Sequence, residues 1–106
     1  MRGRMVWLGL SSLLLVTPLW AQDRLQLIEQ GKKLFLDQGC YGCHTVGKMG
    51  TPIAPDLSEI GSKYPPSYLS GWLRDPATQK PKAHMPKIQL NEEEIRALVT
   101  YLSSLR

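Results

Sequence analysis

The segment Gly39–Gly47, "GCYGCHTVG", contains both cysteines of the 106-residue chain and one of its two histidines. Two residues separate Cys40 from Cys43, and His44 follows the second cysteine directly. This spacing is compatible with four kinds of site: a disulfide, a dithiol redox centre, part of a zinc site, or a covalent attachment point for haem. The rest of the chain has to decide among them.

The first three interpretations each leave part of the motif unexplained. A disulfide accounts neither for the histidine nor for the close spacing of the two cysteines. A thioredoxin-like dithiol needs its CxxC in a βαβ unit, and no segment of this chain alternates convincingly like a strand. A structural zinc ion needs four protein ligands, whereas the motif offers three and only His84 could add a distant nitrogen.

Haem attachment accounts for both cysteines and the histidine. Thiols three positions apart can add to the two vinyl groups of the porphyrin, with Tyr41 and Gly42 as spacers between Cys40 and Cys43. The next residue, His44, then projects toward the iron as an axial ligand. In a chain with no other cysteine, one covalent haem with its iron is the interpretation that we favour.

A second axial ligand has to come from a distant part of the chain. Residues 82–87, "KAHMPK", place His84 and Met85 side by side in a charged loop bounded by prolines. A methionine in such a loop is poorly explained as core filler, and a Met/His pair is typical of electron-transfer haems. We therefore expect Met85 to bind the iron opposite His44, with His84 as the alternative. Met49 is too close to His44 in sequence to reach across the ring.

The N-terminal segment has the pattern of a secretory signal peptide. Two arginines precede an apolar run, Met5–Val16, and a plausible cleavage site ends at Ala21. The alternative is an uncleaved anchor over residues 5–21, but such a helix is about 25 Å long and the hydrocarbon core is ~30 Å thick. We expect residues 1–21 to be cleaved as a signal and residues 22–106 to form a single domain in the periplasm or another extracytoplasmic space.

Charge and length exclude several classes of function. Without Arg2 and Arg4, eleven Lys and Arg remain against nine Asp and Glu, a net charge of +2. No run of five or more basic residues occurs, which argues against nucleic-acid binding and against a polybasic membrane patch. A chain of this length buries only about 60–65% of its unfolded surface, so its apolar core alone is marginal. A large covalent cofactor would enlarge that core.

The remaining pattern predicts an all-α fold with long connections rich in proline and glycine. Residues 23–38 have helical periodicity, and residues 91–105 begin with Asn91 and Glu94 at capping-box spacing before an apolar stripe. A short middle helix fits residues 65–73, which start with two prolines. The apolar face expected for the first helix consists of Leu25, Leu27, Ile28, Leu34 and Phe35.

Gly31 lies in the middle of this apolar face. A glycine costs about 1 kcal/mol of helix propensity relative to alanine, so a packing reason is expected for it. The simplest reason is a second helix that crosses at short distance, and the C-terminal helix supplies a partner.

These segments together resemble the class I c-type cytochromes. The resemblance covers nearly all of residues 22–106 and includes "GKKLF", "CYGCH", "APDL", "YLSGWLRDP", "HMP" and "ALVTYLSSL". It implies a small fold in which the N- and C-terminal helices cross, with a short middle helix and long loops that enclose the haem. In that family a glycine and an aromatic of the first helix meet an aromatic of the last, which implies contacts among Gly31, Phe35 and Tyr101.

The resemblance also implies contacts around the haem. Pro55 matches a proline whose carbonyl accepts a hydrogen bond from the proximal histidine, although "APDL" replaces the commoner glycine–proline pair. Tyr64 and Trp72 resemble residues that line the haem or bind its propionates in some members. As aromatics of a small domain, they are explained equally well by core packing.

The expected function is one-electron transfer between respiratory or other redox enzymes, on the outer side of a membrane and without catalysis by this chain. An iron bound by His44 and Met85 has no open position for a substrate. One alternative is a haem subunit held permanently in a larger oxidoreductase, and another is an enzyme or gas sensor in which Met85 is displaced. We expect a monomer.

Partner proteins are expected to dock where the haem comes closest to solvent, which in this family is the edge that carries the thioethers. Basic residues surround the segments that would border this edge, and no acidic residue occurs between Pro76 and Leu90. We expect a basic rim that steers an acidic partner. The rim consists of Lys48, Lys80, Lys82 and Lys87.

Overall fold

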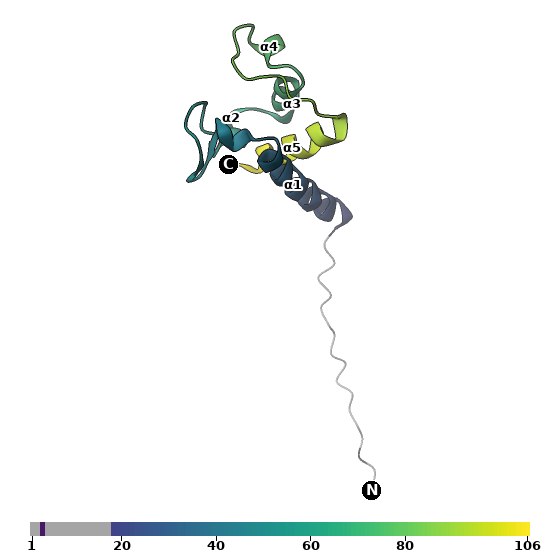
Figure 1. The fold of residues 1–106 in the computed structure, drawn as a ribbon. Coiled ribbons are helices and arrows are strands. Elements are labelled where there is room, and N and C mark those ends of the chain that lie inside the picture. The colour runs from purple at the N-terminus through teal and green to yellow at the C-terminus, as the bar shows by residue number, and fades with distance from the viewer. Residues whose placement is uncertain (1–2, 4–17) are drawn as a thin grey trace.

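The structure, a computed structural model, describes Gly3 and residues 18–106 (Figure 1). Most of the predicted signal peptide, residues 1–2 and 4–17, lies outside the described residues. The fold is helical, as predicted, with one short hairpin as its only sheet within the described part of the chain. The elements in chain order are α1 (Leu19–Asp37), the 3₁₀ turn η1 (Cys40–Gly42), β1 (Thr45–Val46), β2 (Met49–Gly50), α2 (Ile60–Lys63), α3 (Pro66–Arg74), α4 (Pro76–Gln79) and α5 (Glu92–Ser104).

The N- and C-terminal helices cross at Gly31, as the sequence predicts. A Cβ atom at this position would collide with the carbonyl oxygen of Ala97 and would lie 2.6 Å from the Cβ of Tyr101. One turn along α1, the Phe35 ring meets the Tyr101 ring edge-on, with 5.6 Å between centroids. Figure 1 shows α1 and α5 crossing near the centre of the folded part. The absence of a side chain on Gly31 therefore sets the distance between the two helices.

A core of large apolar side chains lies where α3 packs on the crossed helices. Leu69 and Leu73 of α3 are buried with the apolar stripe of α5 and with Phe35 of α1. Leu25, which the periodicity assigned to this core, is instead 60% exposed. That assignment was wrong because Leu25 lies more than one turn before the crossing at Gly31, where this face of α1 is open to solvent.

Two polar contacts fix the beginning of α5. The predicted capping box is present: the Asn91 side chain accepts from the Glu94 backbone N–H at 2.8 Å, and the Glu94 carboxylate accepts from the Asn91 N–H at 3.0 Å. Arg74, at the end of α3, donates to both carboxylate oxygens of Glu92, with 3.1 Å between Nε and Oε1. This ion pair lowers the pKa of Glu92 and raises that of Arg74. It joins the last turn of α3 to the first turn of α5.

Three short features were not predicted. α2 packs against the end of α5, where the Gly61 N–H donates to the Leu105 carbonyl at 2.7 Å. α4 begins at Pro76 and is capped by the Asp75 carboxylate, which accepts from the Ala77 N–H at 3.1 Å. β1 and β2 form an antiparallel hairpin directly after the cysteine segment. These elements frame the two long connections that carry the predicted site residues.

Candidate functional site

The two cysteines flank a tight turn at the end of α1. Gly39 has a φ of 76°, in the left-handed region, which lets the chain leave the helix. Cys40 is half-buried and Cys43 is exposed, and both are free thiols rather than a disulfide. Burial raises the pKa of the Cys40 thiol. The His44 N–H closes the turn by donating to the Cys40 carbonyl at 2.9 Å.

Tyr41 connects this turn to the helix crossing. Its ring meets the Phe35 ring edge-on, with 4.7 Å between centroids. Burial and a hydrogen bond with Tyr41 raise the pKa of Tyr101 to about 12. From the sequence, Tyr41 is expected only as a spacer, whereas in the structure its ring anchors the turn to α1. The signal available in the sequence was an aromatic residue between the cysteines of a chain that already has aromatics on both crossing helices.

His44 is oriented by the loop that follows the hairpin. Its Nδ1 donates to the Pro55 carbonyl at 2.8 Å. Because a carbonyl oxygen only accepts, Nδ1 carries the proton and the lone pair of Nε2 is left for a metal. The contact expected from the resemblance is therefore present, on residues 11 positions apart in the chain.

Asp56 holds that loop against the hairpin. Its Oδ1 accepts from the Thr45 hydroxyl at 2.9 Å, from the Ser58 hydroxyl at 2.7 Å and from the Ser58 N–H at 3.2 Å. The hydrogen bonds from Ser58, and then the one from Thr45, lower the pKa of the carboxyl. Since Asp56 follows Pro55 directly, this network fixes the carbonyl that orients His44. Asp56 was not predicted as a site residue, although an Asp two residues before a Ser is typical of an Asx turn.

Met85 lies in the connection between α4 and α5. It is half-buried and packs against the core, whereas the neighbouring His84 is exposed. The indole N–H of Trp72, on α3, donates to the Met85 sulfur at 3.0 Å. Met49, which the sequence interpretation set aside as a ligand, is 61% exposed. Of the residues considered as the second ligand, only Met85 combines burial with a fixed position for its donor atom.

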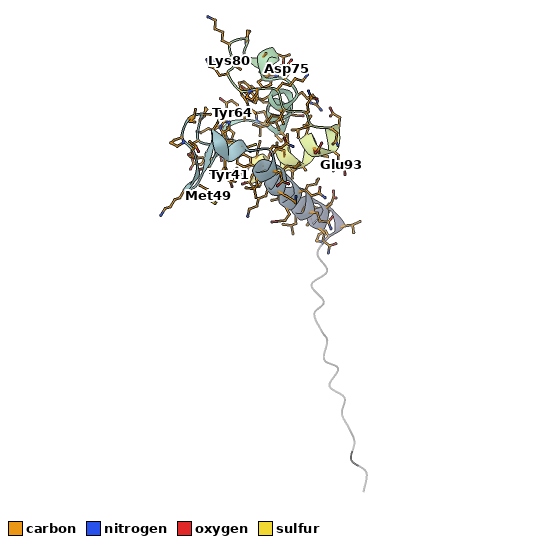
Figure 2. The ribbon with its side chains drawn as sticks, in the orientation of Figure 1. Tyr41, Met49, Tyr64, Asp75, Lys80 and Glu93 are labelled. Atoms are coloured by element: carbon orange, nitrogen blue, oxygen red, sulfur yellow. The ribbon has the colours of Figure 1, made fainter. Side chains whose placement is uncertain are left out.

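The two other aromatic residues expected near the site, Tyr64 and Trp72, are joined into one stack by Tyr68, which was not predicted. The rings of Tyr64 and Tyr68 are 4.4 Å apart and inclined by 15°. The ring of Tyr68 is 6.3 Å from that of Trp72, with an interplanar angle of 26°. Tyr64 is 42% exposed, so the stack leads from the surface to Met85. Figure 2 shows Tyr64 between Met49 of the hairpin and Lys80 at the end of α4.

The donor groups at this site are of the types that hold a haem. Among the described residues, no group of three or more His, Cys, Asp and Glu side chains comes together as a metal site. Two free thiols, an imidazole with its Nε2 available and a thioether are the kinds of group that can attach a haem and bind its iron. Half-buried apolar side chains pack against the same core as Cys40 and Met85: Val46, Leu57, Ile60 and Tyr68.

A family model described as "Cytochrome c" matches residues 28–106 of the chain. The protein belongs to the cytochrome c family. Its cofactor is therefore a covalently bound haem c with iron, and the CxxCH spacing of Cys40 and Cys43 fits that attachment. Electron transfer by the haem follows as the general activity of this cytochrome c domain.

Several curated proteins are similar to this cytochrome c. The second subunit of the cytochrome c oxidase of Alkalihalophilus pseudofirmus is 34% identical over 89 residues, which cover 76% of this chain and 26% of that protein. A nitric oxide reductase subunit of Paracoccus denitrificans is 31% identical over 94 residues, which cover 77% of this chain and 63% of that protein. The CcoP subunit of the cbb3-type cytochrome c oxidase of Helicobacter pylori is 31% identical over 91 residues, which cover 76% of this chain and 29% of that protein. The cytochrome thus spans less than two thirds of each relative.

The four lysines of the expected rim are exposed but come from two different segments. Lys48 lies in the turn of the hairpin, whereas Lys80, Lys82 and Lys87 lie in the connection between α4 and α5. Figure 2 shows Met49, the neighbour of Lys48, at the lower left of the folded part and Lys80 at its top. The three lysines of the connection are therefore a group separate from Lys48.

Proposed function

We propose that the protein is a one-electron carrier whose haem iron is bound by His44 and Met85. The observation that carries the proposal is that hydrogen bonds fix both proposed ligand side chains. Nδ1 of His44 donates to the Pro55 carbonyl at 2.8 Å, and the Met85 sulfur accepts a hydrogen bond from the Trp72 indole N–H at 3.0 Å. His84, the alternative ligand, is exposed beside it.

The chain contributes orientation, exclusion of water and control of charge. A bound haem supplies the iron couple that gains and loses one electron. The Pro55 carbonyl fixes the ring of His44, which is the role of a group that orients a metal ligand. Met85 offers a neutral thioether, which favours the reduced form, and the apolar side chains beside it disfavour the extra charge of the oxidised form.

We propose residues 22–106 as the working domain, after removal of residues 1–21 as a signal during export. Leu19 and Trp20, the first residues of α1, are 83% and 73% exposed, so their loss would remove little from the core. Within the described residues, no helix has the length and the apolar character needed to cross a membrane. The exposure of the first turn of α1 supports a domain that keeps its core when residues 1–21 are removed.

A second candidate function is that of a fixed electron-transfer subunit. The relatives are named as subunits of cytochrome c oxidases and of a nitric oxide reductase, and this chain matches only a part of each. In both roles an acidic surface of the partner would meet Lys80, Lys82 and Lys87. Co-purification of the tagged protein from its own host distinguishes the two, because a fixed subunit remains with its complex at high salt.

The axial ligand is tested by replacing Met85 and His84 separately. Met85→Ala should lower the reduction potential and abolish the weak near-red absorption band of ferric haem bound by a thioether. His84→Ala should leave both nearly unchanged, because that side chain is exposed. The reduced wild-type protein should bind CO slowly, since no coordination position is open. The reverse result for the two variants would establish a bis-histidine site.

A further inference from the structure

The first residue of the proposed mature domain is a glutamine. Gln22 directly follows Ala21, at which the proposed signal ends. In the full chain the backbone N–H of Gln22 donates to the Pro18 carbonyl at 3.2 Å. Because Pro18 belongs to the segment that is removed, cleavage takes this acceptor away and converts the amide nitrogen of Gln22 into the α-amine of a new N-terminus.

The side chain of Gln22 supplies an electrophile that this amine can reach. An α-amine has an ordinary pKa of about 7.7–8.0, so part of it is uncharged and nucleophilic near neutral pH. When the nitrogen attacks the side-chain carbon Cδ, an N–Cδ bond forms and closes a five-membered lactam ring. The bond from Cδ to Nε2 breaks, and Nε2 leaves as ammonia with one proton from the amine. The reaction therefore needs no oxidant, reductant or second reactant.

The position of Gln22 in α1 tolerates such a ring. Gln22 is exposed, so closing the ring displaces nothing from the core. After cleavage it becomes the first residue of α1, and the N–H groups of the first turn of a helix have no acceptor within the helix. A ring that includes this nitrogen therefore breaks no helical hydrogen bond, which is also why proline is tolerated at the first position of a helix.

Charge at this end of α1 favours the cyclised form. An α-ammonium group would add positive charge to the positive end of the helix dipole, and Arg24 already adds one in the same turn. The carboxylate of Asp23 is paired with Arg96 of α5, with 3.6 Å between Oδ2 and Nη2. Because the lactam is neutral, cyclisation removes a positive charge that opposes the helix dipole and competes with Arg96 for Asp23.

We infer that Gln22 is a modification site, at which the mature N-terminus closes to pyroglutamate with loss of ammonia. The inference rests on the proposed removal of residues 1–21 and adds a chemical step that follows it. A pyroglutamyl end has no primary amine for an aminopeptidase to bind. The modification therefore protects the exposed first turn of α1 from shortening in the space to which the domain is exported.

Mass spectrometry of the haem-loaded protein from its own host tests the modification. After digestion by a protease that cuts at glutamate, the peptide of residues 22–29 should be lighter than its sequence by one ammonia. An isotope-labelled peptide of the same sequence, added before digestion, measures any cyclisation during preparation. Gln22→Asn is the matched control, because its shorter side chain could close only a strained four-membered ring. The N-terminal peptide of this variant should have its unmodified mass.

Stepwise chemical sequencing from the N-terminus gives a second readout and separates the inference from the proposed export. The wild type should yield no sequence until a pyroglutamate-specific peptidase exposes Asp23, whereas Gln22→Asn should yield sequence at once. A peptide that begins at Gln22 with its unmodified mass overturns the inference and leaves the proposed cleavage standing. A mature chain that begins at any other residue overturns cleavage after Ala21, and the inference with it.

Discussion

The absence of a side chain at Gly31 allows the two longest helices to approach each other closely. The collision that a Cβ would make there is with the backbone of α5, at Ala97, and not with the flexible end of a side chain. Backbone atoms in the middle of a packed helix cannot move aside without shifting the whole helix. Gly71, also in a helix, differs in this respect, because a Cβ there would meet the amide nitrogen of the Gln79 side chain at 2.6 Å.

We predict opposite effects for the same substitution at these two glycines. Gly31→Ala should destabilise the haem-loaded protein by about 1–3 kcal/mol through overpacking, despite the gain in helix propensity. Gly71→Ala should be neutral or slightly stabilising, because the Gln79 side chain can rotate away. Denaturant unfolding of the two variants beside the wild type measures both. Equal stabilities for the two variants would show that the helices separate freely at Gly31.

Among the elements, the hairpin and its following loop depend on one carboxylate. Asp56 accepts three hydrogen bonds, and these lower its pKa below the ordinary aspartate value. A carboxyl whose pKa is lower in the folded state stabilises the fold above its unfolded pKa. That contribution disappears as the pH falls through the lowered pKa. The loop that orients His44 should therefore be acid-sensitive.

We predict that Asp56→Asn destabilises the protein at neutral pH and that the difference from the wild type shrinks in acid. The sign follows from the lowered pKa, since only the ionised carboxylate is favoured by the three donors. Unfolding by urea at neutral pH and at several values below the ordinary pKa of about 3.9 measures the difference. Glu59→Gln, at an exposed carboxylate outside the network, is the control. A difference that stays constant over this range contradicts the prediction.

The elements that could be predicted from the sequence are those whose pattern is long enough to repeat. α1 and α5 show several turns of periodicity, and α5 also has its capping box at Asn91 and Glu94. α2 and α4 have four residues each and β1 and β2 have two, so no period can appear in them. Their positions depend on tertiary contacts, such as the hydrogen bond from Gly61 to Leu105.

The site was predictable where covalent spacing determines it and less so where side chains meet in space. The CxxCH spacing of Cys40, Cys43 and His44 belongs to the chain itself, and the contact with Pro55 followed from the family resemblance. The hydrogen bond from Trp72 to Met85 joins α3 to a loop 13 residues on, and no local pattern encodes it. For this reason two roles were considered for Trp72 from its sequence context, and neither was a contact with the sulfur.

At the scale of the whole molecule, charge is distributed unevenly along the connection from α4 to α5. Lys80, Lys82 and Lys87 are exposed in a stretch without acidic residues, and three glutamates follow in the first turn of α5. Of these glutamates, Glu92 is paired with Arg74. Positive charge on one segment and negative charge on the next give the molecule an electric dipole and a surrounding field. Such a field steers the first encounter with a charged partner.

We predict that changing Lys80, Lys82 and Lys87 together to Gln slows oxidation by ferricyanide, an anionic reagent, at low salt. The dependence on ionic strength should flatten, because charges more than about 8–10 Å apart are screened at physiological salt. Stopped-flow kinetics of the reduced protein measures this. The control is Lys32, Lys33 and Lys63 changed to Gln, which alters the net charge equally. Identical slowing in both variants would mean that net charge, and not the connection, steers the reagent.

Tyr41 has a consequence for the speed of electron transfer. Each transfer requires the surrounding atoms to adjust to the new charge on the iron, and the energy of that adjustment forms a barrier in both directions. The segment that carries the two cysteines is held by Tyr41 against Phe35 and Tyr101, at the crossing of α1 and α5. Atoms placed in advance need little rearrangement. We therefore expect a small reorganisation energy, so that driving force and distance to the partner set the rate.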